Sequence, residues 1–223
     1  MVSIAIDGPA GAGKSTVAKK IAKILKYVYV DTGSLYRAIA FYIIENKICI
    51  DDPKNIINSL HNIDIKIEYE NSTQKINLNL KDVSDKIRTN EISMLASQIS
   101  AIKEVRDFLL ALQRNIAKQN NVVMDGRDIG TVILPFADIK IFLTASAKKR
   151  SIRRYRQLLS KGIKSTYNTV FKEILIRDKN DSNRSIAPLK PAKDSIIVDS
   201  TNLTLNESIN KILNIILDYE QGR

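Results

Sequence analysis

One segment constrains this chain more than any other: Gly8-Pro9-Ala10-Gly11-Ala12-Gly13-Lys14-Ser15. It matches the pattern G-x-x-x-x-G-K-[ST], in which backbone N–H groups face one concavity and large side chains would block a phosphate. The apolar run before it, residues 2–6, predicts a buried strand. After it, Val17, Ile21 and Leu25 fall on one face of a helix. A strand, a glycine-rich loop and a helix in this order predict an α/β fold that binds phosphate.

The same loop suggests roles for individual side chains. The helix that begins near Lys14 adds the positive N-terminal end of its dipole to the loop. We expect Lys14 to reach the β- and γ-phosphates of a nucleoside triphosphate, and Ser15 to bind Mg²⁺ through its hydroxyl. The motif therefore predicts binding of ATP or GTP, and it leaves the fate of the γ-phosphate open.

The rest of the chain alternates between strand and helix patterns. Further strands are predicted at residues 27–30, 122–124, 139–143 and 196–198, and helices at residues 35–46, within 90–117 and after a capping box formed by Thr204 and Glu207. Strands that alternate with helices favour a parallel sheet with right-handed crossovers.

Residues 63–80 break this rhythm. Apolar and polar residues alternate there on either side of the polar segment Asn71-Ser72-Thr73-Gln74. A period of two with a polar segment between predicts a β-hairpin, its turn at these four residues and one face in solvent. We interpret this hairpin as an insertion outside the parallel core.

Composition and charge narrow the function classes. The 223 residues are 44% hydrophobic and contain no apolar run near the ~20 residues of a membrane span, so we expect a protein of the cytoplasm without a signal peptide. The single cysteine, Cys49, excludes an internal disulfide and a cysteine-based zinc site. Residues 148–190 carry 13 cations and three acids, a net +10 within the chain's +11. Such a block attracts phosphate, whether on a nucleotide, a nucleic acid or a membrane.

Several polar residues follow predicted strands, where open α/β sheets bind ligands. Asp125 ends the strand at residues 122–124, a position that fits an acid holding Mg²⁺ through water. Because Asp-Gly is also a common turn, a capping role for Asp125 stays open. Asp31, Thr32, Arg127 and Asp128 lie at similar positions.

Arginine is the residue type that suits a bidentate grip on phosphate. Arg37, Arg127, Arg177 and Arg184 lie away from the apolar stripes, in or near predicted loops and helix ends. For any one of them taken alone, a solvated surface charge is the favoured interpretation, because most charged residues are exposed. The clustering of cations in the basic block, which contains Arg177 and Arg184, favours a phosphate-binding role for the arginines of that block.

Seven segments of the chain, in order, resemble bacterial cytidylate kinases: GPAGAGKST at 8–16, DTGSLYR at 31–37, SDKIRT at 84–89, MLASQISA at 94–101, MDGRDIGT at 124–131, KIFLTAS at 140–146 and RDKNDSNRSIAPL at 177–189. The resemblance implies a single kinase domain over residues 1–223 with a three-layer P-loop fold, a five-stranded parallel sheet wrapped by helices. It also implies an insertion that binds the nucleoside monophosphate, residues 33–100 with the hairpin at about 63–80, and a basic helical lid, residues 148–187. The implied reaction is Mg²⁺-dependent transfer of the γ-phosphate of ATP to CMP or dCMP.

The resemblance also implies a set of site residues. The ATP side comprises Gly8, Pro9, Ala10, Gly11, Ala12, Gly13, Lys14, Ser15 and Thr16, with Arg153 and Arg154 from the lid, and the metal side Ser15 and Asp125. On the acceptor side, Arg37, Arg127 and Arg177 would grip the phosphate, Thr32, Ser97, Arg106, Asp128 and Arg184 would lie near the cytosine, and Asp181 near the ribose. Lys14, Arg127 and Arg177 are the candidate catalytic residues. Thr32 stands where Ser is common, and Asn180 and Ser182 stand where arginines are frequent.

Two other functions remain as alternatives. The first is a kinase for another nucleoside monophosphate, UMP or AMP, because base choice depends on a few polar contacts. The second is an RNA-associated P-loop ATPase that uses the basic block. The absence of tryptophan and an aromatic content of 6% count against RNA binding, so we expect small nucleotides as partners, with no nucleic acid or membrane, and a monomer.

Overall fold

The computed structural model describes residues 1–70 and 73–222. Its main sheet has five parallel strands in the order β2-β6-β1-β7-β8. They are β1 (Ser3–Asp7), β2 (Val28–Asp31), β6 (Val122–Gly126), β7 (Ile139–Thr144) and β8 (Ile196–Asp199). The predicted five-stranded parallel sheet is confirmed.

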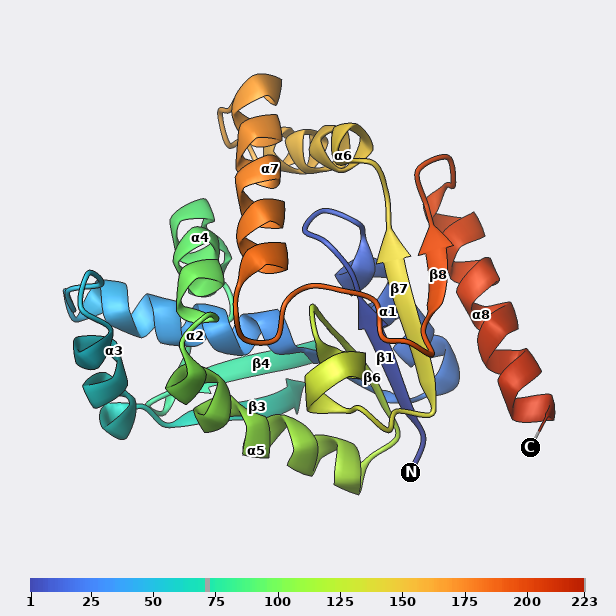
Figure 1. Cartoon of the computed structure of the whole chain (residues 1–223), viewed down its shortest axis with the longest axis horizontal. Helices are drawn as coiled ribbons and strands as arrows, with labels where there is room; N and C mark the ends of the chain where they lie inside the picture. The colour runs from blue at the N-terminus through green and yellow to red at the C-terminus, as the bar shows by residue number, and fades with distance from the viewer. Residues whose placement is uncertain (71–72, 223) are drawn as a thin grey trace.

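Helices cover both faces of this sheet (Figure 1). α1 (Lys14–Leu25) and α8 (Leu205–Gln221) pack on one face, where Ile21 and Ile212 are fully buried against β1 and β7. On the other face, the central strands contact α5 (Lys103–Gln119) and a single π-helical turn, η3 (Ile129–Ile133). The three-layer architecture expected of a P-loop fold is thus present. None of the helices in the described part of the chain is both long and apolar enough to cross a membrane.

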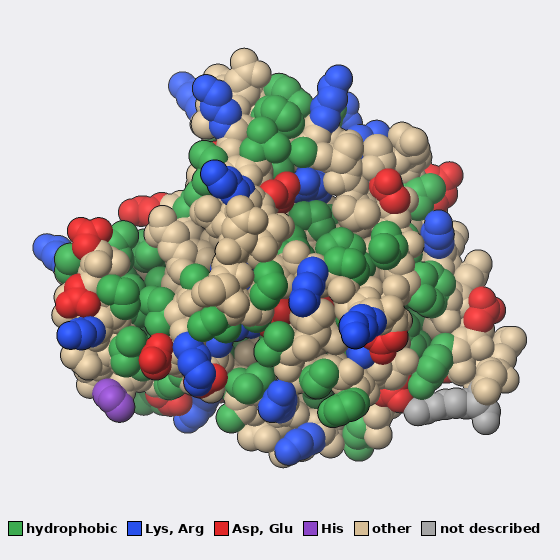
Figure 2. Space-filling view, viewed as in Figure 1, with side chains coloured by type: hydrophobic (Ala, Val, Ile, Leu, Met, Phe, Trp, Pro, Cys, Tyr) green, Lys and Arg blue, Asp and Glu red, His purple; other side chains and the backbone are tan. Residues whose placement is uncertain are grey.

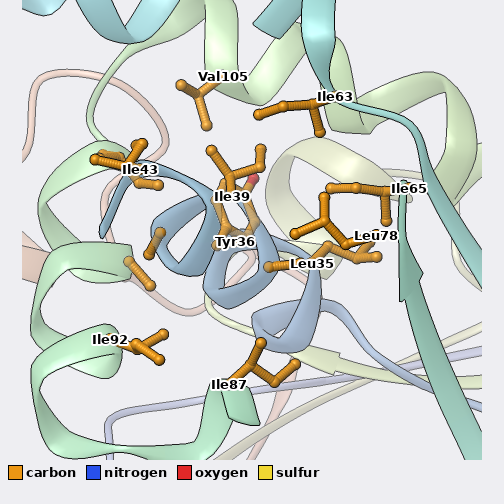
Figure 3. Close-up of a cluster of buried hydrophobic side chains, with 14 of the residues drawn as sticks. Leu35, Tyr36, Ile39, Ile43, Ile63, Ile65, Leu78, Ile87, Ile92 and Val105 are labelled. Atoms are coloured by element: carbon orange, nitrogen blue, oxygen red, sulfur yellow. The ribbon is translucent and has the colours of Figure 1, made fainter. Parts of the chain in front are cut away.

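The segment predicted as an insertion packs around a hydrophobic core that it shares with α5. Its elements are α2 (Thr32–Glu45), α3 (Pro53–Ser59), η1 (Leu60–Asn62), β3 (Ile65–Glu70), β4 (Thr73–Leu78), β5 (Lys81–Asp82), η2 (Lys86–Arg88) and α4 (Asn90–Ile99). Figure 3 shows Leu35, Ile39 and Ile43 of α2 facing side chains from the neighbouring elements. This packing explains how an insertion outside the main sheet keeps a fixed shape.

The predicted hairpin is present, with two corrections. β3 and β4 pair antiparallel, but β5 adds a third strand, so the hairpin is part of a small sheet. Thr73 and Gln74, predicted in the turn, belong to β4, because the buried Gln74 amide bonds to the end of β2. The other two predicted turn residues, Asn71 and Ser72, lie outside the described residues.

The segment predicted to be a lid contains a pair of helices, α6 (Ala147–Ser160) and α7 (Tyr167–Asn183), at one end of the molecule (Figure 1). Leu158, Val170 and Ile174 pack there against Ala10 of the phosphate loop. Figure 2 shows Lys and Arg side chains over this end. The helical spacing predicted within residues 90–117 corresponds to two helices, α4 (Asn90–Ile99) and α5, separated by a turn at residues 100–102.

Candidate active site

The phosphate loop lies where the sequence predicts it, between β1 and α1. Gly8 has a φ of +146°, and a Cβ added there would come within 2.0 Å of the Leu143 carbonyl oxygen, so the first glycine allows the loop to lie directly on β7. Gly13, with a φ of +95°, is the N-cap of α1. The Lys14 ammonium donates to the Pro9 carbonyl at 2.9 Å and is buried. Burial and the Arg127 charge lower the pKa of Lys14 well below its ordinary value.

A cleft of about 830 Å³ opens above this loop. Its walls come from the phosphate loop, the carboxyl ends of β2 and β6, α4, α5 and the lid. Among the predicted site residues, Gly8 and Pro9 do not line it, and it brings together the others: Ala10, Gly11, Ala12, Gly13, Lys14, Ser15, Thr16, Thr32, Arg37, Ser97, Arg106, Asp125, Arg127, Asp128, Arg153, Arg154, Arg177, Asp181 and Arg184.

Asp125 points toward α1 from the end of β6. The Ser15 hydroxyl donates to Asp125 Oδ2 at 2.8 Å, and the Tyr29 hydroxyl donates to Oδ1 at 2.9 Å. The carboxylate therefore faces the phosphate loop and does not cap the turn after β6, which had remained the alternative. Burial and the nearby Asp31 charge raise the pKa of Asp125 to about 6. Burial also raises the pKa of Tyr29, so this phenol stays a donor.

A buried charge network surrounds Asp128 at the far end of the cleft. The Arg106 guanidinium pairs with Asp128 Oδ2, and Arg184 donates to Oδ1 at 3.2 Å. Arg106 also lies over the Tyr36 ring, 5.6 Å from its centroid, and Arg184 donates to the Ser100 hydroxyl at 2.9 Å. Burial raises the pKa of Asp128, and the two arginines oppose this shift. Arg106 of α5, Arg184 directly after α7 and Asp128 in the loop after β6 thereby hold one another in place.

Asp181 forms a second buried acid between the two ends of the cleft. It accepts from the Ser97 hydroxyl at 2.8 Å and from Arg127 Nε at 2.9 Å. Burial acts to raise the pKa of Asp181, but the Arg127 and Arg177 charges outweigh it and keep the pKa below its ordinary value. Asp181 is therefore a carboxylate that fixes Arg127 beside the phosphate loop.

Two arginines keep buried donors without a partner in the described structure. Arg37 pairs with Asp31 at 2.7 Å through Nη2, yet its Nε has no acceptor, and neither does Arg177 Nε. Burial and the neighbouring Arg127 charge lower the pKa of Arg177 to about 10. Buried donors are nearly always satisfied, so these two groups are available to an acceptor that enters the cleft.

The two lid arginines of the predicted ATP side differ in their contacts. Arg153 donates to the Ser200 carbonyl at 2.6 Å and to the Ser200 hydroxyl at 3.1 Å, so it joins α6 to the loop after β8. Arg154 donates to Gln157 on its own helix at 2.9 Å. Burial lowers the pKa of both.

Sequence reasoning missed four residues that build this site: Asp7, Tyr29, Tyr36 and Arg150. Asp7 directly precedes the phosphate loop and Tyr29 lies one residue before a predicted strand end, so both positions carried a signal. Arg150 was one of 13 cations in the basic block, and nothing local separated it from the rest. Tyr36 lies within the helix predicted at residues 35–46, and the structure shows that it lines the cleft and lies under Arg106.

With this geometry in view, comparisons with known proteins identify the relatives of the chain. The family model for cytidylate kinase matches residues 4–218. The chain belongs to the cytidylate kinase family. It is 51% identical over 213 residues to the cytidylate kinase of Carboxydothermus hydrogenoformans, covering 96% of each chain. It is 48% identical over 214 residues to that of Caldicellulosiruptor saccharolyticus, covering 96% of this chain and 95% of the relative.

A solved structure supports the fold alone. An uncharacterized protein from Eubacterium ventriosum aligns over 100% of both chains with a TM-score of 0.52, at 13% sequence identity. Membership of the cytidylate kinase family rests on the sequence comparisons, and it agrees with the resemblance that the motifs already indicated.

Proposed function

We propose that this protein transfers the γ-phosphate of ATP to CMP or dCMP, giving ADP and CDP or dCDP. The observation that carries the proposal is the pair of orphaned guanidinium donors, Arg37 Nε and Arg177 Nε, in the cleft that also holds Lys14. Because the phosphate loop is the place for a triphosphate, a second set of anion donors in the same cleft suits a phosphorylated acceptor. The cytidylate kinases that the chain resembles at 48–51% identity support the choice of CMP.

The ATP end would use residues 8–16 around the phosphates, with Lys14 on the β- and γ-phosphates. Arg153, with its contacts to Ser200, and Arg154 would line the outer part of this end. Buried arginines and a buried lysine offset the charge that spreads over the transferring phosphoryl group, and they are in place before the reaction.

The oxygen atoms beside the phosphate loop show whether this site suits Mg²⁺. Among the residues that the structure describes, no cluster of three or more His, Cys, Asp or Glu side chains could hold a metal ion by itself. Ser15 and Asp125 nevertheless place a hydroxyl and a carboxylate oxygen 2.8 Å apart beside the loop. Mg²⁺ favours oxygen ligands and completes its shell with water and substrate phosphates, so this pair fits. When bound, the ion would neutralise charge on the β- and γ-phosphates.

The acceptor end needs no general base. The phosphate of CMP is already an anion near neutral pH and can attack directly, so the protein's task is to position it. Arg37, Arg127 and Arg177 would hold this phosphate in line with ATP. The only histidine, His61, is exposed in η1, in the insertion. Residues 33–100 would carry the acceptor and residues 148–187 would close over the transfer to exclude water.

Cytosine recognition would fall to the Asp128 network. Asp128, Arg106 and Arg184 have buried side chains, and their donors and acceptors would meet the polar edge of the base. Ser97 and Thr32 lie in the same cleft, and Asp181 lies near enough to Ser97 to serve the ribose side. A site built from buried polar groups rejects a base that leaves them unpaired, which disfavours UMP or AMP as the main substrate.

We extend the proposal to the working form of the protein. The free thiol of Cys49 is exposed, which suits a reducing compartment such as the cytoplasm. Both nucleotide ends lie in one cleft of one chain, so a monomer would suffice. The RNA-associated ATPase is not proposed, because the proposed reaction assigns the arginines of the basic block that line the cleft to nucleotide binding.

Transfer itself is tested with ATP labelled at its γ-phosphate. The protein, Mg²⁺ and CMP should move the label into CDP, and Lys14→Ala should lower the rate by roughly 10²–10³-fold while circular dichroism stays unchanged. Label that appears as free phosphate and never in CDP would contradict the proposal.

A further inference from the structure

The loop that carries Arg127 and Asp128 is supported by very little structure of its own. It is followed by η3, a single π-helical turn in which Leu134 N donates to Ile129 O at 2.7 Å and Ile133 N donates to Asp128 O at 3.2 Å. One turn of helix is too short to be stable alone, since nucleation fixes several residues for each bond gained. Something outside the turn must therefore hold it.

The N-terminal end of this turn is held by Asp7. Its Oδ1 accepts the Ile129 N–H and its Oδ2 accepts the Gly130 N–H, both at 2.8 Å. Asp7 is only 5% exposed, and it is the last residue of β1, next to Gly8 of the phosphate loop. A carboxylate at the first N–H groups of a helical turn satisfies donors that have no partner within the turn. The same side chain thereby ties the acceptor loop to the strand that supports the ATP end.

The C-terminal end is held by Arg114. Its Nε donates to the Ile133 carbonyl at 2.9 Å and its Nη2 to the Val132 carbonyl at 3.0 Å. These carbonyls lie at the end of η3, where a cation and two donors are favourable. Arg106, two turns earlier on the same helix α5, pairs with Asp128. Helix α5 therefore makes two contacts with this region: Arg106 pairs with Asp128, and Arg114 holds the turn η3 that follows.

We propose that Asp7 and Arg114 are positioning residues for acceptor recognition, because they clamp η3 at its two ends and so fix Arg127 and Asp128. The inference rests on the proposed function, in which Arg127 binds the CMP phosphate and Asp128 binds the cytosine. Neither Asp7 nor Arg114 is among the residues that line the cleft, so each acts through the loop and does not touch the substrate. The four hydrogen bonds of the clamp form within the protein before CMP binds. The acceptor loop therefore does not have to be ordered when CMP binds.

The test compares Arg114→Met and Arg114→Lys with a matched control, Lys118→Met. Lys118 is exposed one turn further along α5, so its variant loses a cation from the same helix without touching η3. Arg114→Met should raise the KM for CMP at least tenfold and change the KM for ATP less than twofold. Arg114→Lys, which keeps one donor and the charge, should recover part of the loss, and Lys118→Met should match the unmodified protein. Amide hydrogen exchange in residues 129–133 should be faster in Arg114→Met.

Asp7→Asn provides the second arm, because its amide keeps one acceptor and turns a donor toward the other N–H. It should also raise the KM for CMP and accelerate exchange at residues 129–133. If a folded Arg114→Met protein changes both KM values equally, or keeps its KM for CMP, the clamp is not a positioning device for the acceptor. Should Arg114→Met fail to fold, Arg114→Lys and Asp7→Asn carry the test. An unmodified protein that does not phosphorylate CMP would overturn the proposed function instead, so the two failures are distinguishable.

Discussion

At the scale of single residues, the cleft is built from charges that burial would penalise unless each had a partner. Asp128 has Arg106 and Arg184, Asp181 has Arg127, and Asp125 has the hydroxyls of two neighbours. The side chains are thereby fixed in orientation before a nucleotide binds. The donors left over are the Nε atoms of Arg37 and Arg177, where we place the acceptor phosphate.

Arg184 tests the acceptor end at this scale. Arg184→Ala leaves Asp128 with Arg106 alone and removes a donor from the site proposed for cytosine. Loss of a hydrogen bond to a charged group costs about 1.5–3 kcal/mol, so the KM for CMP should rise roughly 10- to 100-fold. The KM for ATP should change little, and steady-state kinetics with each substrate varied in turn measures both. An equal change in the two KM values would place Arg184 elsewhere.

Asp7 gives a pH dependence of opposite sign to ordinary acid denaturation. Burial raises the pKa of Asp7 to about 6, from an ordinary value near 3.8, against the opposing effect of its two backbone hydrogen bonds. Between these values the folded chain holds a proton that the unfolded chain has lost. Asp7 therefore contributes stability that is full below pH ~4 and lost as the pH rises through 6.

Denaturant unfolding of the unmodified protein and of Asp7→Asn measures this effect. Between pH 7.5 and pH 4.5 the difference in unfolding free energy should move in favour of the unmodified protein by about 2 kcal/mol, at 1.36 kcal/mol for each pKa unit. Parallel pH profiles for the two proteins would show that Asp7 does not titrate in this range.

At the scale of elements, the sequence predicted the parts whose pattern is local. All five strands of the main sheet, α1, α8 and its capping box follow from apolar spacing and cap residues near them in the chain. The π-helical turn η3 was not predicted, because what holds it is Asp7 and Arg114, more than 100 and nearly 20 residues away. The third strand of the small sheet, β5, was also missed, because two residues are too few for a periodicity.

In the candidate site too, the features that depend on a local motif could be predicted and those that depend on distant partners could not. The phosphate loop and the Asp125 position could be predicted from motifs with a known mechanism. The partners of the arginines could not be predicted, because Arg150 and Arg153 looked alike in a block of 13 cations. In the structure, both donate to the phosphate loop, but Arg150 also pairs with Asp178 of α7, whereas Arg153 also binds the loop after β8.

Arg150 also links the two lid helices to the phosphate loop. Its guanidinium makes a bidentate pair with Asp178 of α7, at 3.0 and 2.6 Å, and donates to the Ala10 carbonyl at 2.9 Å. Arg150→Met should lower the unfolding free energy by about 2 kcal/mol, less than for a fully buried pair because Asp178 keeps 24% of its side chain exposed. Lys179→Met, at the exposed neighbour of Asp178, is the matched control. Equal stability of the two variants would show that this ion pair does not hold the lid.

At the scale of the whole molecule, the excess charge has a definite place. Residues 148–190 carry nearly all of it, and they form the two lid helices and the segment after them. Some of these cations, Arg153, Arg154, Arg177 and Arg184 among them, line the cleft, while others, such as Lys164 and Lys172, are exposed. A cleft with cations at both ends attracts substrates that carry phosphate. Without such substrates, repulsion between the cations disfavours closure of the cleft.

The central claim is that this cleft joins ATP to a cytosine nucleotide, and the most direct test is acceptor selectivity. Release of ADP, coupled to a second enzyme, gives kcat/KM for CMP, dCMP, UMP, AMP and GMP with ATP and Mg²⁺ at fixed concentration. We expect CMP and dCMP to exceed each of the others by at least ~10²-fold, because the wrong base leaves the Asp128 network unpaired. If another monophosphate has the highest kcat/KM, the Asp128 network does not read cytosine. If none is phosphorylated, the protein is not a nucleoside monophosphate kinase.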